Sequence, residues 1–101
     1  MIVYNITIKI IPSIEPAWIE WQKQEHIPEI MATGCFTDYK FFHLMDEDES
    51  EGITFVVQYF ATDPAHYQRY IDEFAPQLRE KAIRKWGEQF IAFRTVMELV
   101  H

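Results

Sequence analysis

The chain has 101 residues, a net charge of −7, 49% hydrophobic and 16% aromatic residues, and one cysteine, Cys35. This composition excludes an intrinsically disordered chain, and the absence of a basic stripe argues against nucleic acid as a partner. The lone cysteine excludes a disulfide framework and a cysteine-rich metal site. We therefore expect a single domain spanning residues 1–101, with one modest core and a reduced, cytoplasmic location.

Residues 2–11 alternate between apolar and mixed positions, which predicts a strand. Asn5, Thr7 and Lys9 interrupt the apolar run, and no basic segment precedes it. These features favour a strand over a signal peptide or a membrane span, so no membrane association is expected. One strand face is apolar and the other is mixed. The apolar face carries Ile2, Tyr4, Ile6, Ile8 and Ile10.

A first helix is predicted after Pro12, because Ile14, Trp18 and Trp21 follow helical spacing. Pro28 lacks an N–H and restricts the residue before it. We therefore expect the helix to be interrupted at residues 26–28. A short turn over residues 29–33 then ends at Gly34.

Two strands are predicted next, over residues 36–45 and 53–60. Both carry large apolar side chains on both faces, for example Phe41 and Phe42. The segment 46–51 between them holds five acidic residues. It resembles the start of a calcium-binding loop, but Glu51 stands where that loop needs glycine, so a solvated turn is expected.

Asp63 and Pro64 predict the start of a second helix, as its N-cap and first residue. Pro76 should kink this helix and Gly87 should end it. A last strand is predicted over residues 90–100. The apolar stripe of the helix consists of Tyr67, Tyr70, Ile71, Phe74, Leu78, Ala82 and Trp86.

The element order β-α-β-β-α-β predicts an α+β, ferredoxin-like fold: a four-stranded antiparallel sheet with two helices on one face. Right-handed crossovers place the first and third strands at its centre. The second sheet face would then expose apolar side chains to water. We therefore expect a homodimer in which two sheets pack face to face.

Six residues along the first helix and its exit, Trp18, Trp21, His26, Pro28, Gly34 and Phe36, resemble a pattern in the dimeric α+β barrel superfamily. That superfamily includes antibiotic-biosynthesis-type monooxygenases and stress-responsive barrels. The whole chain is more closely similar to an uncharacterised family of short bacterial proteins, through residues 1–5, 25–28 and 93–98. The resemblance implies the dimeric barrel fold, but it implies no particular activity.

His26 is the leading candidate for a catalytic residue, because it lies beside the expected helix break among aromatic residues. An ordinary histidine pKa of about 6.5 suits acid–base chemistry. The alternative is that the His26 ring caps the broken helix by a hydrogen bond to a freed carbonyl.

Five residues are predicted to bind a ligand: Asn5, Trp21, His26, His43 and Tyr59. Asparagine disfavours strands, so Asn5 needs a reason to be there. Tyr4, Trp21, His43 and Tyr59 can share a cavity with His26. A box of aromatic side chains with one histidine and one amide suits a small apolar, aromatic or polyketide-like ligand. Core packing is the alternative for each residue taken singly.

The four histidines have no metal-ligand spacing, and we expect no metal site and no cofactor. Two functions remain open. One is a small-molecule-binding, structural or regulatory module. The other is a cofactor-free monooxygenase or isomerase. A polar group that converges with His26 on one point would favour catalysis, and its absence would favour binding or a purely structural role.

Overall fold

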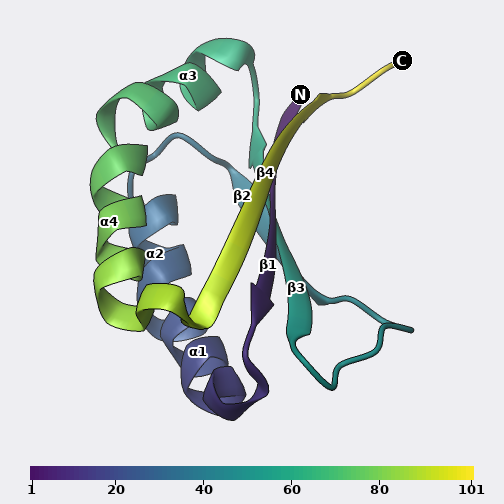
Figure 1. Cartoon of the computed structure of the whole chain (residues 1–101). Coiled ribbons are helices and arrows are strands. Elements are labelled where there is room, and N and C mark those ends of the chain that lie inside the picture. Colours follow the sequence, from purple (N-terminus) through teal and green to yellow (C-terminus); the bar gives the residue numbers. More distant parts are fainter.

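The computed structural model describes residues 1–101 and contains a four-stranded antiparallel sheet with helices on one face (Figure 1). The strands are β1 (Ile2–Ile10), β2 (Asp38–His43), β3 (Ile53–Ala61) and β4 (Phe90–Glu98). Their order in the sheet is β2-β3-β1-β4, so β1 and β3 are central. The α+β, ferredoxin-like prediction is confirmed.

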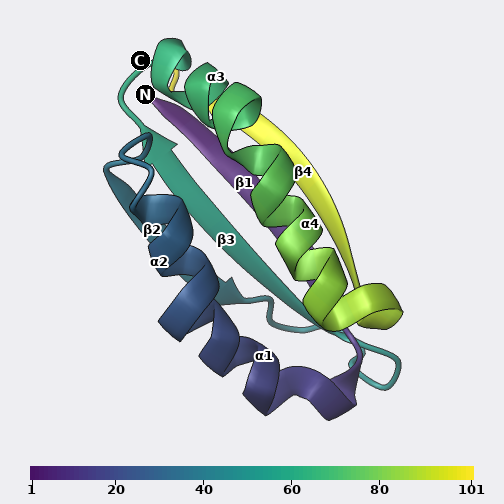
Figure 2. The ribbon, with the colours of Figure 1, turned by 90° about the vertical axis from the view of Figure 1, so that its left-hand side faces the viewer.

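Two helical runs lie side by side across this face (Figure 2). Each run consists of two α-helices, and short 3₁₀ turns flank the first run at its start and the second at its end. The first run is Pro12–Ile14, α1 (Glu15–Trp21), the π-helical turn η2 (Gln22–His26) and α2 (Ile27–Met31). The second run is α3 (Pro64–Glu73), α4 (Ala75–Trp86) and Gly87–Gln89. No helix is long and apolar enough to cross a membrane.

The predicted interruption of the first helix at residues 26–28 is a π turn over Gln22–His26, not a break. A π turn absorbs Pro28, and the helix continues into α2. The Ile27 N–H donates to the Gln22 carbonyl, five residues back, instead of the usual four. The wider turn accommodates a proline that would crowd the preceding turn of a regular α-helix. The run then ends near Gly34, whose φ of +75° suits glycine.

The extra residue in η2 decides which side chains face the sheet. Two helical turns of regular α-helix span about seven residues. Counted from Trp18 and Gln22, that repeat would direct Glu25 and Glu29 inward. The π turn shifts the repeat by one residue, so that His26 and Ile30 face inward instead. Ile30 is fully buried, and His26 is partly buried.

The α-helices of the second run begin and end at the predicted residues. The Asp63 carboxylate accepts a hydrogen bond from the His66 N–H at 2.9 Å, as an N-cap should. The predicted kink at Pro76 is a break at Phe74, with Pro76 in the first turn of α4. Gly87 ends α4 with a φ of +58°.

The core lies between the sheet and the helices. The inward faces of β1 and β3 supply ten of its residues, because every second side chain in each strand is buried. Tyr4 lies in an aromatic cluster, with its ring centroid 5.5 Å from that of Tyr67 and 5.7 Å from that of Tyr70. Its hydroxyl accepts a hydrogen bond from Arg79 Nη2 at 2.9 Å. Strand β2 is shorter than predicted, because Phe36 enters the core before the strand begins.

No helix covers the second face of the sheet, here called the open face. Several large apolar side chains are exposed on it, and Phe93 keeps 61% of its surface exposed. Asn5 lies on the same face, where its Oδ1 accepts a hydrogen bond from Gln58 Nε2 at 3.2 Å. The other large apolar side chains exposed there are Phe42, Ile91 and Met97.

Candidate functional site

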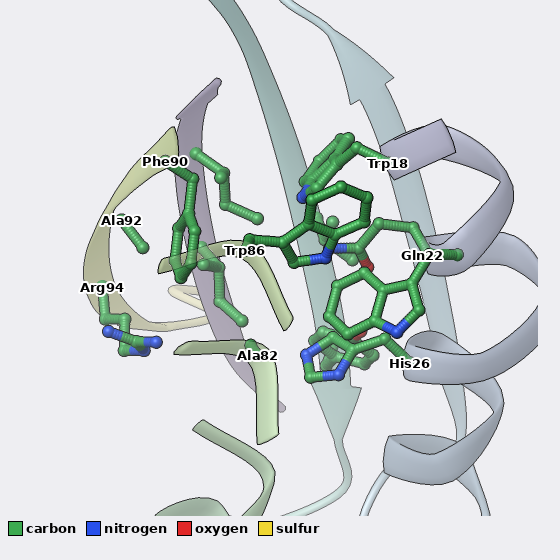
Figure 3. A pocket seen from close by; sticks show the side chains of 13 residues that line it. Trp18, Gln22, His26, Ala82, Trp86, Phe90, Ala92 and Arg94 are labelled. Carbon is green, nitrogen blue, oxygen red and sulfur yellow. The ribbon is translucent and has the colours of Figure 1, made fainter. Parts of the chain in front are cut away.

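A cavity of about 40 Å³ lies between the sheet and the two helical runs (Figure 3). All three tryptophans of the chain line it, and ten of its 13 lining residues are hydrophobic. The lining consists of Ile6, Ile8, Trp18, Trp21, Gln22, His26, Val57, Tyr59, Ala82, Trp86, Phe90, Ala92 and Arg94.

Aromatic packing holds one wall of this cavity in place. The Trp21 ring stacks on His26, with centroids 4.5 Å apart and planes 18° apart. Trp86 meets Trp21 edge-on at 5.7 Å, which joins α4 to α1. Offset-stacked and edge-on aromatic pairs each contribute about 0.5–1.5 kcal/mol beyond their burial. The His26 ring orientation is therefore determined by packing, without a hydrogen bond.

Three buried polar atoms of the lining have no hydrogen-bond partner in the protein: Gln22 Oε1, His26 Nδ1 and Trp86 Nε1. A fourth such atom in the chain, Arg79 Nε, belongs to a residue outside the lining. Gln22 keeps only 3% of its surface exposed. Leaving a buried polar group unpaired costs about 1–3 kcal/mol, so three around one cavity are a costly arrangement.

Burial lowers the pKa of His26 from 6.5 to about 4. The nearby Glu29 carboxylate opposes this shift, and the Lys81 and Arg94 cations add to it. Glu29 is held by an ion pair with Lys81, at 2.7 Å. His26 is therefore a neutral imidazole at neutral pH, and its low pKa makes it a weak base.

The alternative role for His26, capping a broken helix, is wrong. The helix is not broken, and the His26 side chain makes no capping hydrogen bond at the start of α2. Its Nδ1 is instead buried without a partner in the protein, and His26 is one of the residues that line the cavity.

Arg94 is the one charged residue of the lining. It comes from β4, and Figure 3 shows it across the cavity from Gln22 and His26. The side chain is exposed and makes no ion pair in the structure. The cavity therefore has an aromatic and polar wall on the first helix and a cationic edge on β4.

Three of the predicted ligand-binding residues, Trp21, His26 and Tyr59, lie together in this lining. The expectation that His43 shares the cavity is wrong. His43 lies near the outer end of β2, where its ring stacks on Phe55 and its Nε2 pairs with Glu49 at 2.6 Å. This pair also anchors the acidic turn.

Asn5 does not lie near the cavity, and it cannot supply the amide of the predicted aromatic box. It belongs to the open face, on the other side of the sheet from His26. Tyr4 faces the helices but belongs to the neighbouring tyrosine cluster instead of the lining.

Gln22 supplies the amide instead, and sequence reasoning missed it together with Trp86 and Arg94. Gln22 follows Trp18 by four residues, so helical spacing places it on the tryptophan face. Trp86 lies on the apolar stripe of its helix, as its spacing predicts. No pattern in the sequence singled out Arg94, because its position depends on how β4 pairs with β1.

The comparison with protein families gives a match over nearly the whole chain. Residues 1–100 match the family described as a domain of unknown function, DUF4286. The chain belongs to the DUF4286 family. A comparison of this DUF4286 sequence with curated proteins found no match. No group of three or more histidine, cysteine or acidic side chains is arranged to hold a metal ion.

Solved structures similar to this DUF4286 chain share its fold at low sequence identity. An EthD (ethyl tert-butyl ether d) family protein from Bacillus halodurans has a TM-score of 0.68 at 17% identity, covering 99% of this chain and all of that one. A mutant of SnoaB, a cofactor-independent oxygenase from Streptomyces nogalater, scores 0.66 at 13%, covering 99% and 94%. A dimeric ferredoxin-like protein from an uncultured marine organism scores 0.65 at 14%, covering 100% and 96%. These likenesses establish the fold.

The depressed His26 pKa predicts a pH-dependent stability that a non-titrating variant lacks. The unfolded chain takes up a proton near pH 6.5 and the folded chain only near pH 4. The stabilisation is therefore complete above pH 6.5 and is lost as the pH falls toward 4. Urea unfolding of wild type and His26→Gln at matched concentrations should show a relative loss of about 3 kcal/mol over that window. Parallel curves for the two proteins would contradict the burial of a neutral imidazole.

Proposed function

We propose that this DUF4286 chain is a small-molecule-binding protein whose ligand contacts the cavity lined by its three tryptophans. The observation that carries the proposal is that three residues lining one cavity, Gln22, His26 and Trp86, each hold a buried polar atom without a partner in the protein. Buried polar atoms are normally paired, and unpaired ones call for an explanation. A bound polar group would supply the missing hydrogen bonds.

The volume of the cavity limits the size of the ligand group that can enter it. A cavity of about 40 Å³ holds about two or three water molecules or one small polar headgroup. Pockets that enclose a whole drug-sized ligand measure about 300–1,000 Å³. The headgroup therefore enters the cavity, and the larger part of the ligand lies where the cavity reaches the surface.

The exposure of the lining residues supports an opening between α4 and β4. The lining residues on the first helix and the central strands are buried, apart from His26. Ala82 on α4 and Ala92 on β4 are partly exposed, and Arg94 is exposed. The two alanines are small, so they leave room for an apolar group to pass between these elements.

The same three residues favour a second candidate, a cofactor-free monooxygenase or isomerase. A neutral His26 beside Trp86 and Gln22 can accept a proton from a substrate held there. Its low pKa makes it a weak base, which restricts this chemistry to acidic substrate protons. Binding needs no such restriction and is the function that the geometry supports best.

A buried amide kept for ligand binding should lower the stability of the free protein. Replacing Gln22 by methionine removes the unpaired Oε1 and nearly preserves the side-chain volume. Gln22→Met should raise the free energy of unfolding by about 1 kcal/mol and weaken the binding of small aromatic compounds. Thermal melts and tryptophan fluorescence titrations measure the two effects.

Gln24→Met is the matched control, because Gln24 lies two residues away on the same helical run with its side chain exposed. It should change neither stability nor binding. If Gln22→Met is less stable than wild type, and no compound in the screen binds either protein, the polar atoms serve ordered water and the ligand-binding proposal fails.

The proposal includes a homodimer formed through the open face. Phe42, Ile91, Phe93 and Met97 leave large apolar surface exposed there, and such a surface marks an interaction site. Similar structures include proteins described as dimeric and ferredoxin-like. A second copy of the same sheet would cover these side chains, and Asn5 would then lie in the interface.

Light scattering at micromolar concentration should give about twice the chain mass of 12.1 kDa. Phe93→Glu introduces a charge on the open face, within the proposed interface, and should yield a monomer. Ile83→Glu changes an exposed apolar residue on α4, away from the open face, and should leave the dimer intact. A wild-type monomer, or dissociation by both variants, would refute this interface.

Cys35 is free and buried. A buried thiol that needs no disulfide partner suits a reducing compartment. This supports the cytoplasmic location that forms part of the proposal.

A further inference from the structure

The cavity is cationic in an acidic chain. The net charge of the protein is −7, yet Arg94 is the one charged residue of the lining. No aspartate or glutamate lines the cavity. Glu29, whose carboxylate partly opposes the lowering of the His26 pKa, is paired with Lys81. A charged ligand group in this cavity would therefore meet a positive edge with no carboxylate among the lining residues to repel it.

The unpaired polar atoms also suit a negatively charged ligand group that accepts hydrogen bonds. The Trp86 Nε1–H is a donor only. The His26 imidazole donates from Nδ1 in one of its two neutral forms, and the Gln22 amide presents either oxygen or nitrogen by a half-turn of its terminal group. All three side chains can therefore donate to one acceptor group, together with the Arg94 guanidinium.

We propose that the cavity binds the oxyanion headgroup of an organic acid, typically a carboxylate, among Gln22, His26 and Trp86 and beside the Arg94 guanidinium. This inference rests on the proposed ligand-binding function and adds the charge class of the ligand. A carboxylate has three heavy atoms, which agrees with a cavity of about 40 Å³. Its oxygens accept several hydrogen bonds at once, and hydrogen bonds to a charged group are the stronger kind.

The apolar part of the acid leaves the cavity between Ala82 and Ala92. Ile83, the residue after Ala82 on α4, keeps 58% of its surface exposed. An aryl or alkyl acid fits this arrangement, with a short linker between its carboxylate and its apolar group.

The test compares three probes of nearly equal size and different charge at neutral pH: phenylacetate, phenylacetamide and the phenethylammonium cation. All three tryptophans line the cavity, so intrinsic tryptophan fluorescence reports on this site. Phenylacetate should bind at least about tenfold more tightly than phenylacetamide, and the cation should bind most weakly. Added salt should weaken the binding of the acid and leave that of the amide unchanged.

Arg94→Gln should weaken phenylacetate binding by about tenfold without affecting phenylacetamide, and Arg94→Lys should restore part of the loss. Arg94 is exposed, so both variants should fold, which circular dichroism verifies. Arg84→Gln is the control, because Arg84 lies outside the lining and pairs with Glu80 on the surface.

Equal binding of acid and amide, with no effect of Arg94→Gln, would overturn the anion assignment while leaving a ligand site in place. Preference for the cation would overturn it as well. If none of the three probes and no compound of the wider aromatic screen changes the fluorescence, both the anion assignment and the ligand-binding function are refuted.

Discussion

The π turn before Pro28 is the constraint on which the site depends. A proline at this position cannot donate to the preceding turn, and the helix adds one residue to that turn instead of breaking. The added residue rotates everything that follows, so that His26 and Ile30 face the sheet where Glu25 and Glu29 otherwise would. One local backbone feature thus replaces a carboxylate by an imidazole beside the tryptophans, and it leaves Glu25 and Glu29 free to pair with Lys81 outside.

Some features of the resulting cavity stabilise the folded protein, and others lower its stability. Aromatic stacking on Trp21 holds His26 in a position where burial keeps the imidazole neutral. Gln22 and Trp86 add polar atoms that the protein itself does not pair. An arrangement that costs stability in the free protein is typical of functional sites, where a ligand or substrate recovers the cost. The fold contributes the frame, which similar solved structures share at 13–17% identity. The chemistry therefore has to be inferred from the side chains of this chain.

Much of the fold could be predicted from local patterns, because alternation, proline and glycine act over a few residues. The N-cap at Asp63, the break near Pro76 and the end at Gly87 all follow from such rules. The residues of the candidate site were harder to predict from the sequence than the fold. Alternation alone separates Asn5 from Tyr4 onto opposite sheet faces, so Asn5 could have been excluded from the cavity. His43 lies on the correct face and in the same cross-strand row as Ile8 and Ala92, but on the edge strand β2, so its exclusion depends on strand order. Gln22 and Arg94 required the helix phase and the β1–β4 pairing, which no single segment specifies.

The candidate site depends on the π turn, which holds His26 as a buried, neutral imidazole in the cavity lining. An NMR titration that follows the His26 ring carbons and nitrogens of the wild-type protein measures this state directly. A buried ring should titrate with a midpoint at about pH 4, well below the ordinary value of 6.5. A midpoint close to 6.5 would mean that the ring is exposed to water, and it would contradict both the inward phase of the helix and the site built on it.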